Sequence, residues 1–140
     1  MLFRSYAGAA AFWRCERRIR ARHGVGVRQH LPDAEVHWPD GSPAGAPVAW
    51  AGECWAVEAE LTPKTVARTV AIMREILTRT GDYGCPAAEA SVPGRPPRHA
   101  RALYLCSPAA LGTVLRARDT LGPLAARVEV RELPPGALLP

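Results

Sequence analysis

Three acidic residues and one lysine form the pattern in this sequence with the most chemical content. Asp33 follows a proline, Glu58 and Glu60 are two residues apart, and Lys64 is the only lysine in the chain. Carboxylate oxygens are the ligands that hard cations such as Mg²⁺ and Mn²⁺ prefer. A cation held in this way can activate water and neutralise charge on a phosphate group. We therefore predict a metal-dependent phosphodiesterase site, with Asp33, Glu58 and Glu60 as metal ligands and Lys64 acting on the phosphate or the attacking water.

Two predicted strands and a helix would position these residues. We expect one strand over about 33–38 and another that begins between 48 and 53 and ends near 61, joined as a hairpin. Side chains alternate between the faces of a strand, so Ala56, Glu58 and Glu60 should share one face. Thr62 and Pro63 are typical of a helix N-cap and first turn, which predicts a helix from about 63 to 79 with Lys64 near its start.

The remaining elements complete an α/β pattern. A strand at about 102–106 after the helix implies a parallel pair with the strand that ends near 61. The full set is a helix at 3–22, a short strand within 25–32, strands at 33–38 and 53–61, a helix at 63–79, a strand at 102–106, a helix at 107–121 and a strand at 127–130. This order, α-β-β-β-α-β-α-β, predicts a mixed central sheet flanked by helices, with a loop at about 81–100 and a proline-rich tail at 133–140.

Size and composition limit the class of protein. The chain has 140 residues, 48% of them hydrophobic and 22% charged, which favours a single domain over residues 1–140. The first 13 residues are too short and too charged to span a membrane. The four cysteines of the chain show no metal-binding spacing. We therefore expect reduced thiols and a cytoplasmic location.

The charge balance favours an anionic partner. The formal net charge is +5 and the isoelectric point is about 9.5, which is consistent with nucleic acid binding. Arg14, Arg18 and Arg22 recur every four residues and would form one stripe of the predicted first helix. We predict that this stripe contacts DNA phosphates, although such a stripe is also typical of a solvated helix face.

Two levels of family resemblance follow from these residues. The Pro32-Asp33 pair, the Glu58-Ala59-Glu60 triplet and the element order resemble the PD-(D/E)xK nuclease superfamily, which has the restriction-endonuclease-like fold. The segments His30–Ala34, Ala56–Lys64, Tyr104–Pro108 and Arg127–Pro134 are similar to the replication-relaxation proteins of actinobacterial plasmids and mobile elements. This second resemblance covers about residues 15–135.

The resemblance implies a function, and one residue of this chain departs from the family motif. It implies a nuclease-like domain that acts on DNA in plasmid replication or transfer, with Asp33 and Glu58 as metal ligands. Glu60 stands where the motif has its lysine, so Lys64 would have to substitute from the helix. Members of the family carry a winged-helix DNA-binding region before this part, so a separate domain or a protein partner could supply DNA recognition.

Several alternatives remain open from the sequence. Without catalysis, the domain could bind DNA or assemble with proteins. Protein interaction would be favoured by an exposed apolar patch built from Trp50, Trp55 or the proline-rich tail. The acids could simply line a solvated strand face paired with arginines, and Lys64 could be exposed.

Individual residues also have alternatives. Asp40 could replace Asp33, but the turn formed by Trp38-Pro39-Asp40-Gly41 explains it. Glu16 could be a further ligand or could pair with Arg20 along the helix. His30 could line the site, because it lies three residues before Asp33.

Overall fold

The computed structural model describes residues 12–17, 19, 30–38, 53–79, 99–134 and 136. In chain order, the elements are β1 (Phe12–Cys15), β2 (Ala34–His37), β3 (Cys54–Glu60), α3 (Val66–Thr78), β4 (Arg101–Cys106), α5 (Pro108–Asp119), the 3-10 helix η3 (Gly122–Arg127) and β5 (Val128–Glu132). None of the helices in these ranges is long and apolar enough to cross a membrane. The predicted loop at 81–100, up to residue 98, and most of the proline-rich tail lie outside the described residues.

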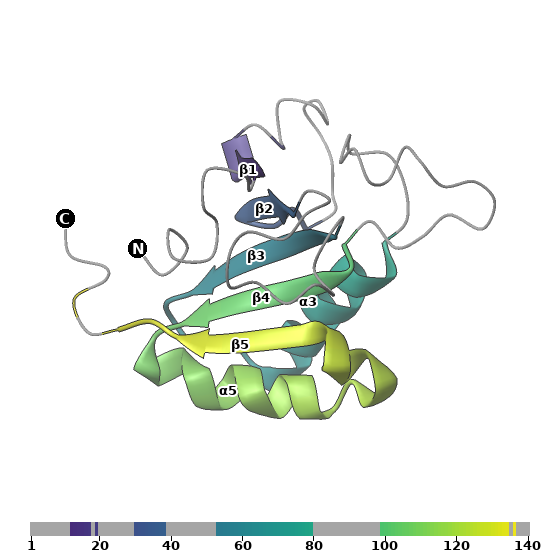
Figure 1. Cartoon of the computed structure of the whole chain (residues 1–140). Helices are drawn as coiled ribbons and strands as arrows, with labels where there is room; N and C mark the ends of the chain where they lie inside the picture. Colours follow the sequence, from purple (N-terminus) through teal and green to yellow (C-terminus); the bar gives the residue numbers. More distant parts are fainter. Residues whose placement is uncertain are drawn as a thin grey trace.

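The described strands form one mixed, open sheet in the order β1-β2-β3-β4-β5 (Figure 1). Strands β1, β2 and β3 pair antiparallel, whereas β3, β4 and β5 pair parallel. The predicted hairpin is confirmed by the pairing of β2 with β3, and the predicted parallel crossover by the pairing of β3 with β4 through α3. The α/β class expected from the sequence is therefore correct.

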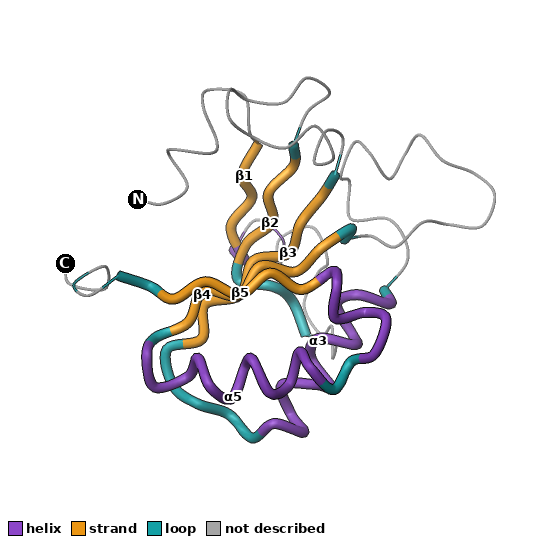
Figure 2. The backbone as a smooth tube through the Cα atoms, turned by 60° about the horizontal axis from the view of Figure 1, so that its bottom comes forward, coloured by secondary structure: helices purple, strands orange, loops and turns teal. Residues whose placement is uncertain are grey.

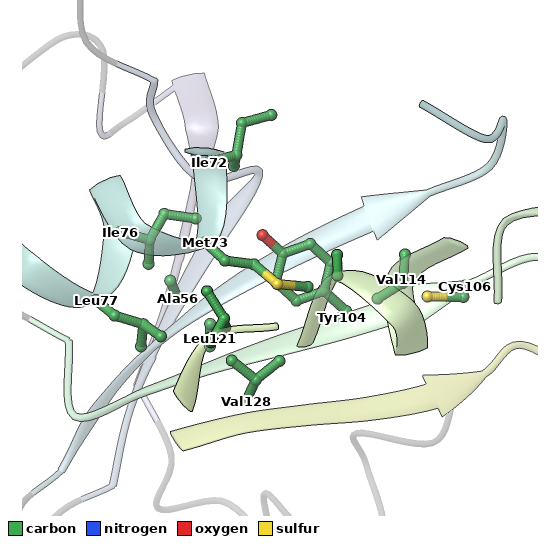
Figure 3. Packing of buried hydrophobic residues seen from close by; sticks show 12 residues of the cluster. Ala56, Ile72, Met73, Ile76, Leu77, Tyr104, Cys106, Val114, Leu121 and Val128 are labelled. Carbon is green, nitrogen blue, oxygen red and sulfur yellow. The ribbon is translucent and has the colours of Figure 1, made fainter. Parts of the chain in front are cut away.

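The main apolar core lies between the sheet and the two helices. Both α3 and α5 cover the same face of the sheet (Figure 2). Helix α3 places Met73, Ile76 and Leu77 against this face, at the three- and four-residue spacing of a buried helical stripe. Figure 3 shows them with Tyr104 from β4, which is fully buried in the same cluster. Each such side chain contributes roughly 1.5–3 kcal/mol by leaving water.

The opposite face of the sheet carries a second, smaller cluster. Val36, Trp38, Trp55, Val57 and Leu103 are all buried there. The rings of Trp38 and Trp55 meet edge to face, with centroids 5.7 Å apart and an interplanar angle of 69°, a favourable aromatic geometry. Trp55 is only 3% exposed, so it does not contribute to an exposed apolar patch that would favour a protein-interaction domain. Trp50 lies outside the described residues.

The prediction of a helix over residues 3–22 is wrong at residues 12–15. These residues form β1, which pairs with β2 in the register Phe12 opposite His37 and Cys15 opposite Ala34. Phe12, Cys15 and Ile19 fit one helical stripe and Trp13 fits an adjoining one, which is why the sequence favoured a helix. Aromatic residues also favour strands, and the partner β2 decides the outcome at residues 12–15. The expected short strand at 25–32 is not formed at residues 30–32, and residues 25–29 lie outside the described part.

Helix α3 starts later than the sequence predicted. Thr65, not Thr62, is the N-cap, because its side chain accepts a hydrogen bond from the N–H of Arg68 at 3.2 Å. Lys64 therefore precedes the helix instead of lying one turn inside it. The helix expected at 107–121 is confirmed as α5, in which Ser107 is the N-cap and Pro108 is the first helical residue.

The position of this cap can be tested by substitution. We expect Thr65→Ala to lower the free energy of unfolding by about 1 kcal/mol, because it removes the side-chain acceptor of an N-terminal helix N–H. Thr62→Ala, at the position that the sequence favoured, should change stability by less than about 0.5 kcal/mol. Urea denaturation of the two variants measures both values, and a larger loss at Thr62 would contradict the observed helix start.

Candidate functional site

The acids predicted from the sequence come together on the face of the sheet that α3 and α5 cover. Glu58 and Glu60 alternate with Trp55 and Val57 along β3, so they share the face of Ala56, as predicted. Both carboxylates are buried, at 2% and 3% exposure. The β2–β3 register pairs Ala34 with Val57, which places the preceding residue, Asp33, next to Glu58. A buried carboxylate is costly unless it is compensated, so the partners of these acids matter.

Asp33 is anchored to β3 through one of its two carboxylate oxygens. Its Oδ2 accepts a hydrogen bond from the N–H of Ala59 at 2.8 Å. Its own C=O accepts the N–H of Glu16 at 2.8 Å, which continues the pairing of β1 with β2 by one residue. The side chain of Asp33 is exposed, so this carboxylate forms the solvent side of the acidic cluster.

Glu58 is paired with His30, which the sequence indicated only as a residue that could line the site. Nε2 of His30 lies 2.9 Å from Oε1 of Glu58. Burial raises the pKa of the Glu58 carboxyl, although the hydrogen bond and the charge of His30 act against this rise. The hydrogen bond to Glu58 raises the pKa of His30 above its ordinary value, although burial acts against it. Together the two groups hold a proton more tightly than either would in water.

Lys64 pairs with Glu60. Its ammonium Nζ contacts Oε1 of Glu60, four residues earlier in the chain, so the pair lies in the connection from β3 to α3. The lysine is about one-third exposed, whereas the Glu60 side chain is 4% exposed. Lys64 therefore compensates a buried carboxylate at the carboxyl end of β3. Of the four predicted catalytic residues, Glu58 and Glu60 lie in β3, and Asp33 and Lys64 contact this strand directly.

Each of the three acids leaves one oxygen without a partner in the described part of the chain. Oδ1 of Asp33, Oε2 of Glu58 and Oε2 of Glu60 accept no hydrogen bond from any described residue, while the other oxygen of each acid is anchored. Tyr104 adds a further polar group, because it lies opposite Glu58 in the β3–β4 register. Its hydroxyl is buried without a hydrogen-bond partner among the described residues, an arrangement that is uncommon in folded proteins.

Whether these groups suit a metal depends on chemistry and on arrangement. The donor set is carboxylate and phenol oxygen, which suits a hard cation. In their present positions, however, no three His, Cys, Asp or Glu side chains in the described ranges form a group that could hold a metal ion. The acids are neighbours, and a bound cation would require their free oxygens to turn toward a common point.

The other predicted residues are not brought into this cluster. Arg14 lies in β1, so the helical arginine stripe is not formed at that position, and Arg18 and Arg22 lie outside the described residues. Asp40 and Arg20 also lie outside them. Glu16 approaches Asp33 through its backbone N–H, as described above.

Two features around the acids were not predicted from the sequence. The first is the support of His30 by α3: its backbone N–H donates to Oε1 of Glu75 at 2.9 Å, and its C=O accepts from Nη2 of Arg79 at 2.6 Å. The second is another histidine–glutamate pair, in which Nε2 of the fully buried His99 lies 2.7 Å from Oε1 of Glu35. These partners are 45 to 64 residues apart, so no local spacing could indicate them.

Comparison with known proteins adds no family assignment. No protein-family model matches the chain, and no curated protein or solved structure matches it significantly.

The coupling between His30 and Glu58 can be measured in protein freed of divalent metals. We expect Glu58→Gln to lower the pKa of His30, because the hydrogen bond to Glu58 is the largest cause of its rise. Glu75→Gln should lower it less, because Glu75 acts only as a more distant charge. NMR titration of the imidazole resonances gives all three values, and an unchanged pKa in Glu58→Gln would contradict the pairing.

The same coupling has a defined sign for stability. A histidine whose folded pKa is raised contributes stability that is complete below its unfolded value of about 6.5 and is lost as the pH rises through the folded value. The raised pKa of Glu58 acts in the same direction. Relative to Glu58→Gln, the wild-type free energy of unfolding should therefore fall as the pH rises through the folded pKa of His30.

Proposed function

We propose that this chain is a metal-dependent nuclease-like domain with a restriction-endonuclease-like fold, which hydrolyses DNA and serves plasmid replication or transfer. The observation that carries the proposal is the shared arrangement of Asp33, Glu58 and Glu60. Each acid has one oxygen fixed by the protein and one oxygen without a partner among the described residues. Anchored carboxylates of this kind are suited to present oxygen ligands to Mg²⁺ or Mn²⁺.

The position of the cluster supports the proposal. Glu58 and Glu60 lie toward the carboxyl end of β3, in the parallel part of the sheet. Ligands of open α/β sheets bind outside the carboxyl ends of the strands. Tyr104, whose buried hydroxyl has no hydrogen-bond partner among the described residues, lies opposite Glu58 in the β3–β4 register. The resemblance of Pro32-Asp33 and Glu58-Ala59-Glu60 to the PD-(D/E)xK motif agrees with this position.

In the proposed reaction, the residues of this chain have separate roles. Asp33, Glu58 and Glu60 would hold the cation, which when bound would lower the pKa of water and offset phosphate charge. Lys64 would shift between Glu60 and the phosphate, since a ligand on Glu60 would weaken its hold on the ammonium. Arginines would supply the contacts to the DNA backbone.

The nuclease proposal predicts metal-dependent cleavage of DNA by the intact chain. With Mg²⁺ or Mn²⁺, we expect nicking of supercoiled DNA or cutting of single-stranded DNA, and Glu58→Gln should lower the rate by roughly 100-fold or more. Glu132→Gln is the matched control, because it removes an exposed carboxylate on β5 and should leave the rate unchanged. Equal rates in wild type and Glu58→Gln would exclude this site as the source of cleavage.

A second function is favoured by the ion pair of Lys64 with Glu60. An acid stands in the motif's lysine position, and the only lysine of the chain neutralises it. These are features of a domain that keeps the nuclease-like fold without catalysis and binds DNA or assembles with a partner that recognises DNA.

This alternative predicts binding without cutting. The affinity for duplex DNA should fall as salt is raised, with a slope of log K against log salt of about −0.9 for each phosphate contact. The same samples incubated with Mn²⁺ should contain only intact DNA. Fluorescence anisotropy at two or more salt concentrations measures the slope, and affinity that does not depend on salt would exclude a backbone-binding role.

A further inference from the structure

The strand β5 lies at one margin of the described sheet (Figure 1). It pairs with β4 on one side, and no strand among the described residues lies on its other side. An edge of this kind presents backbone N–H and C=O groups that can pair with another chain. The side chains of Glu129 and Arg131 are 37% and 60% exposed, and Glu132 is also exposed. This part of the strand is therefore open to solvent.

The backbone of β5 turns its polar groups alternately toward β4 and away from it. The N–H of Leu133 donates to the C=O of Cys106 at 2.8 Å, so Leu133 faces β4. By the alternation of a strand, Val130 and Glu132 direct their N–H and C=O groups outward. Within the described ranges, no residue forms a hydrogen bond with these outward groups. Val130 thus lies near the middle of an edge that can accept a further strand.

The side chains of β5 alternate between the two faces of the sheet. Val130 packs against the main core, on the face that α3 and α5 cover. Glu129 lies opposite Leu103 in the β4–β5 register, and Leu103 belongs to the cluster on the other face. Glu129 and Arg131 therefore share the face without helices, where they form an ion pair with each other. An exposed pair of this kind contributes little stability, so it can exchange partners at small cost.

One acid and one base on either side of Val130 make this edge complementary to itself. If a second copy adds antiparallel with the two Val130 residues opposite each other, Glu129 of each copy faces Arg131 of the other. Such residues form a non-hydrogen-bonded pair, in which the Cα atoms are about 4.5 Å apart and the side chains are closest. Sliding one strand by two residues would instead place Glu129 opposite Glu129 or Arg131 opposite Arg131, which is destabilising.

We propose that β5 is the interface of a two-fold symmetric dimer of this chain, in which the edges of two sheets pair antiparallel about Val130. The outward backbone groups of Val130 supply the hydrogen bonds, and the facing charges of Glu129 and Arg131 select the register. A two-fold axis closes the assembly, because each copy occupies the edge of the other. This inference goes beyond the proposed function and does not depend on it.

The test is sedimentation velocity of the intact chain over about a hundredfold range of concentration. Wild type should pass from monomer to dimer as the concentration rises. Arg131→Glu and Glu129→Arg each place like charges opposite each other at two points of the dimer, so each should weaken dimerisation by about 10-fold or more. Arg74→Glu is the matched control, because it makes the same charge change at an exposed position of α3 and should alter the affinity by less than about twofold.

A mixture of the two variants tests the register itself. When Arg131→Glu and Glu129→Arg are combined in equal amounts, two acids on one edge face two arginines on the other. A heterodimer should therefore form with at least the affinity of the wild-type dimer, and a fluorescent label on one variant reports it. Because both substituted side chains are exposed, the separate variants should keep the circular dichroism spectrum of wild type.

Each possible result either supports or overturns the interface. A wild type that stays monomeric at every concentration would show that a second copy does not occupy this edge. A dimer that both variants retain would use a different surface. Loss of the dimer in both variants without recovery in the mixture would show that Glu129 and Arg131 do not face each other. Loss in each variant followed by recovery in the mixture supports the proposed pairing.

Discussion

The burial of Glu58 and Glu60 on the face of β3 that also carries the apolar core is the constraint on which the surrounding structure depends. A carboxylate removed from water costs several kcal/mol unless charge or hydrogen bonds compensate it. Here the compensation comes from His30 for Glu58 and from Lys64 for Glu60. The segment before β2 and the connection from β3 to α3 are thus held against the same strand by the two acids.

This constraint also explains the role of α3 in the site. The helix packs Met73, Ile76 and Leu77 into the core, while Glu75 and Arg79 hold the backbone of His30. One helix therefore stabilises the sheet through apolar contacts and orients a polar residue at the acidic cluster. Removing one partner of a buried pair leaves the other charge uncompensated. This lowers the free energy of unfolding more than replacing both partners with apolar side chains does.

The parts of the fold that follow from local patterns were predictable from the sequence. The two-residue alternation of β3 correctly placed Glu58 and Glu60 on one face, and the helix expected from residue 107 begins at Pro108, after the Ser107 cap. The start of α3 was not predictable from the sequence, since both Thr62 and Thr65 can cap a helix. Only the folded backbone selects Thr65. The strand β1 was misread because its four residues fit either periodicity until β2 pairs with them.

The acidic cluster was predictable in its members but not in its partners. The types and spacing of Asp33, Glu58 and Lys64 indicated a common site from the sequence. The pairing of His30 with Glu58 joins residues 28 apart, and the hydroxyl of Tyr104 is brought to the cluster only by the β3–β4 register. Such contacts depend on sheet register and helix placement, which no short motif specifies.

The strand β5 has a neighbour in the described sheet on one side only, where it pairs with β4. Its outer backbone is a template on which the strand of another molecule could add, and long apolar edge strands aggregate in this way. Glu129, Arg131 and Glu132 place charge along this short strand, and Glu129 pairs with Arg131. The alternation of valine with charged residues thus lets one strand complete the core and also resist open-ended aggregation at the margin of the sheet.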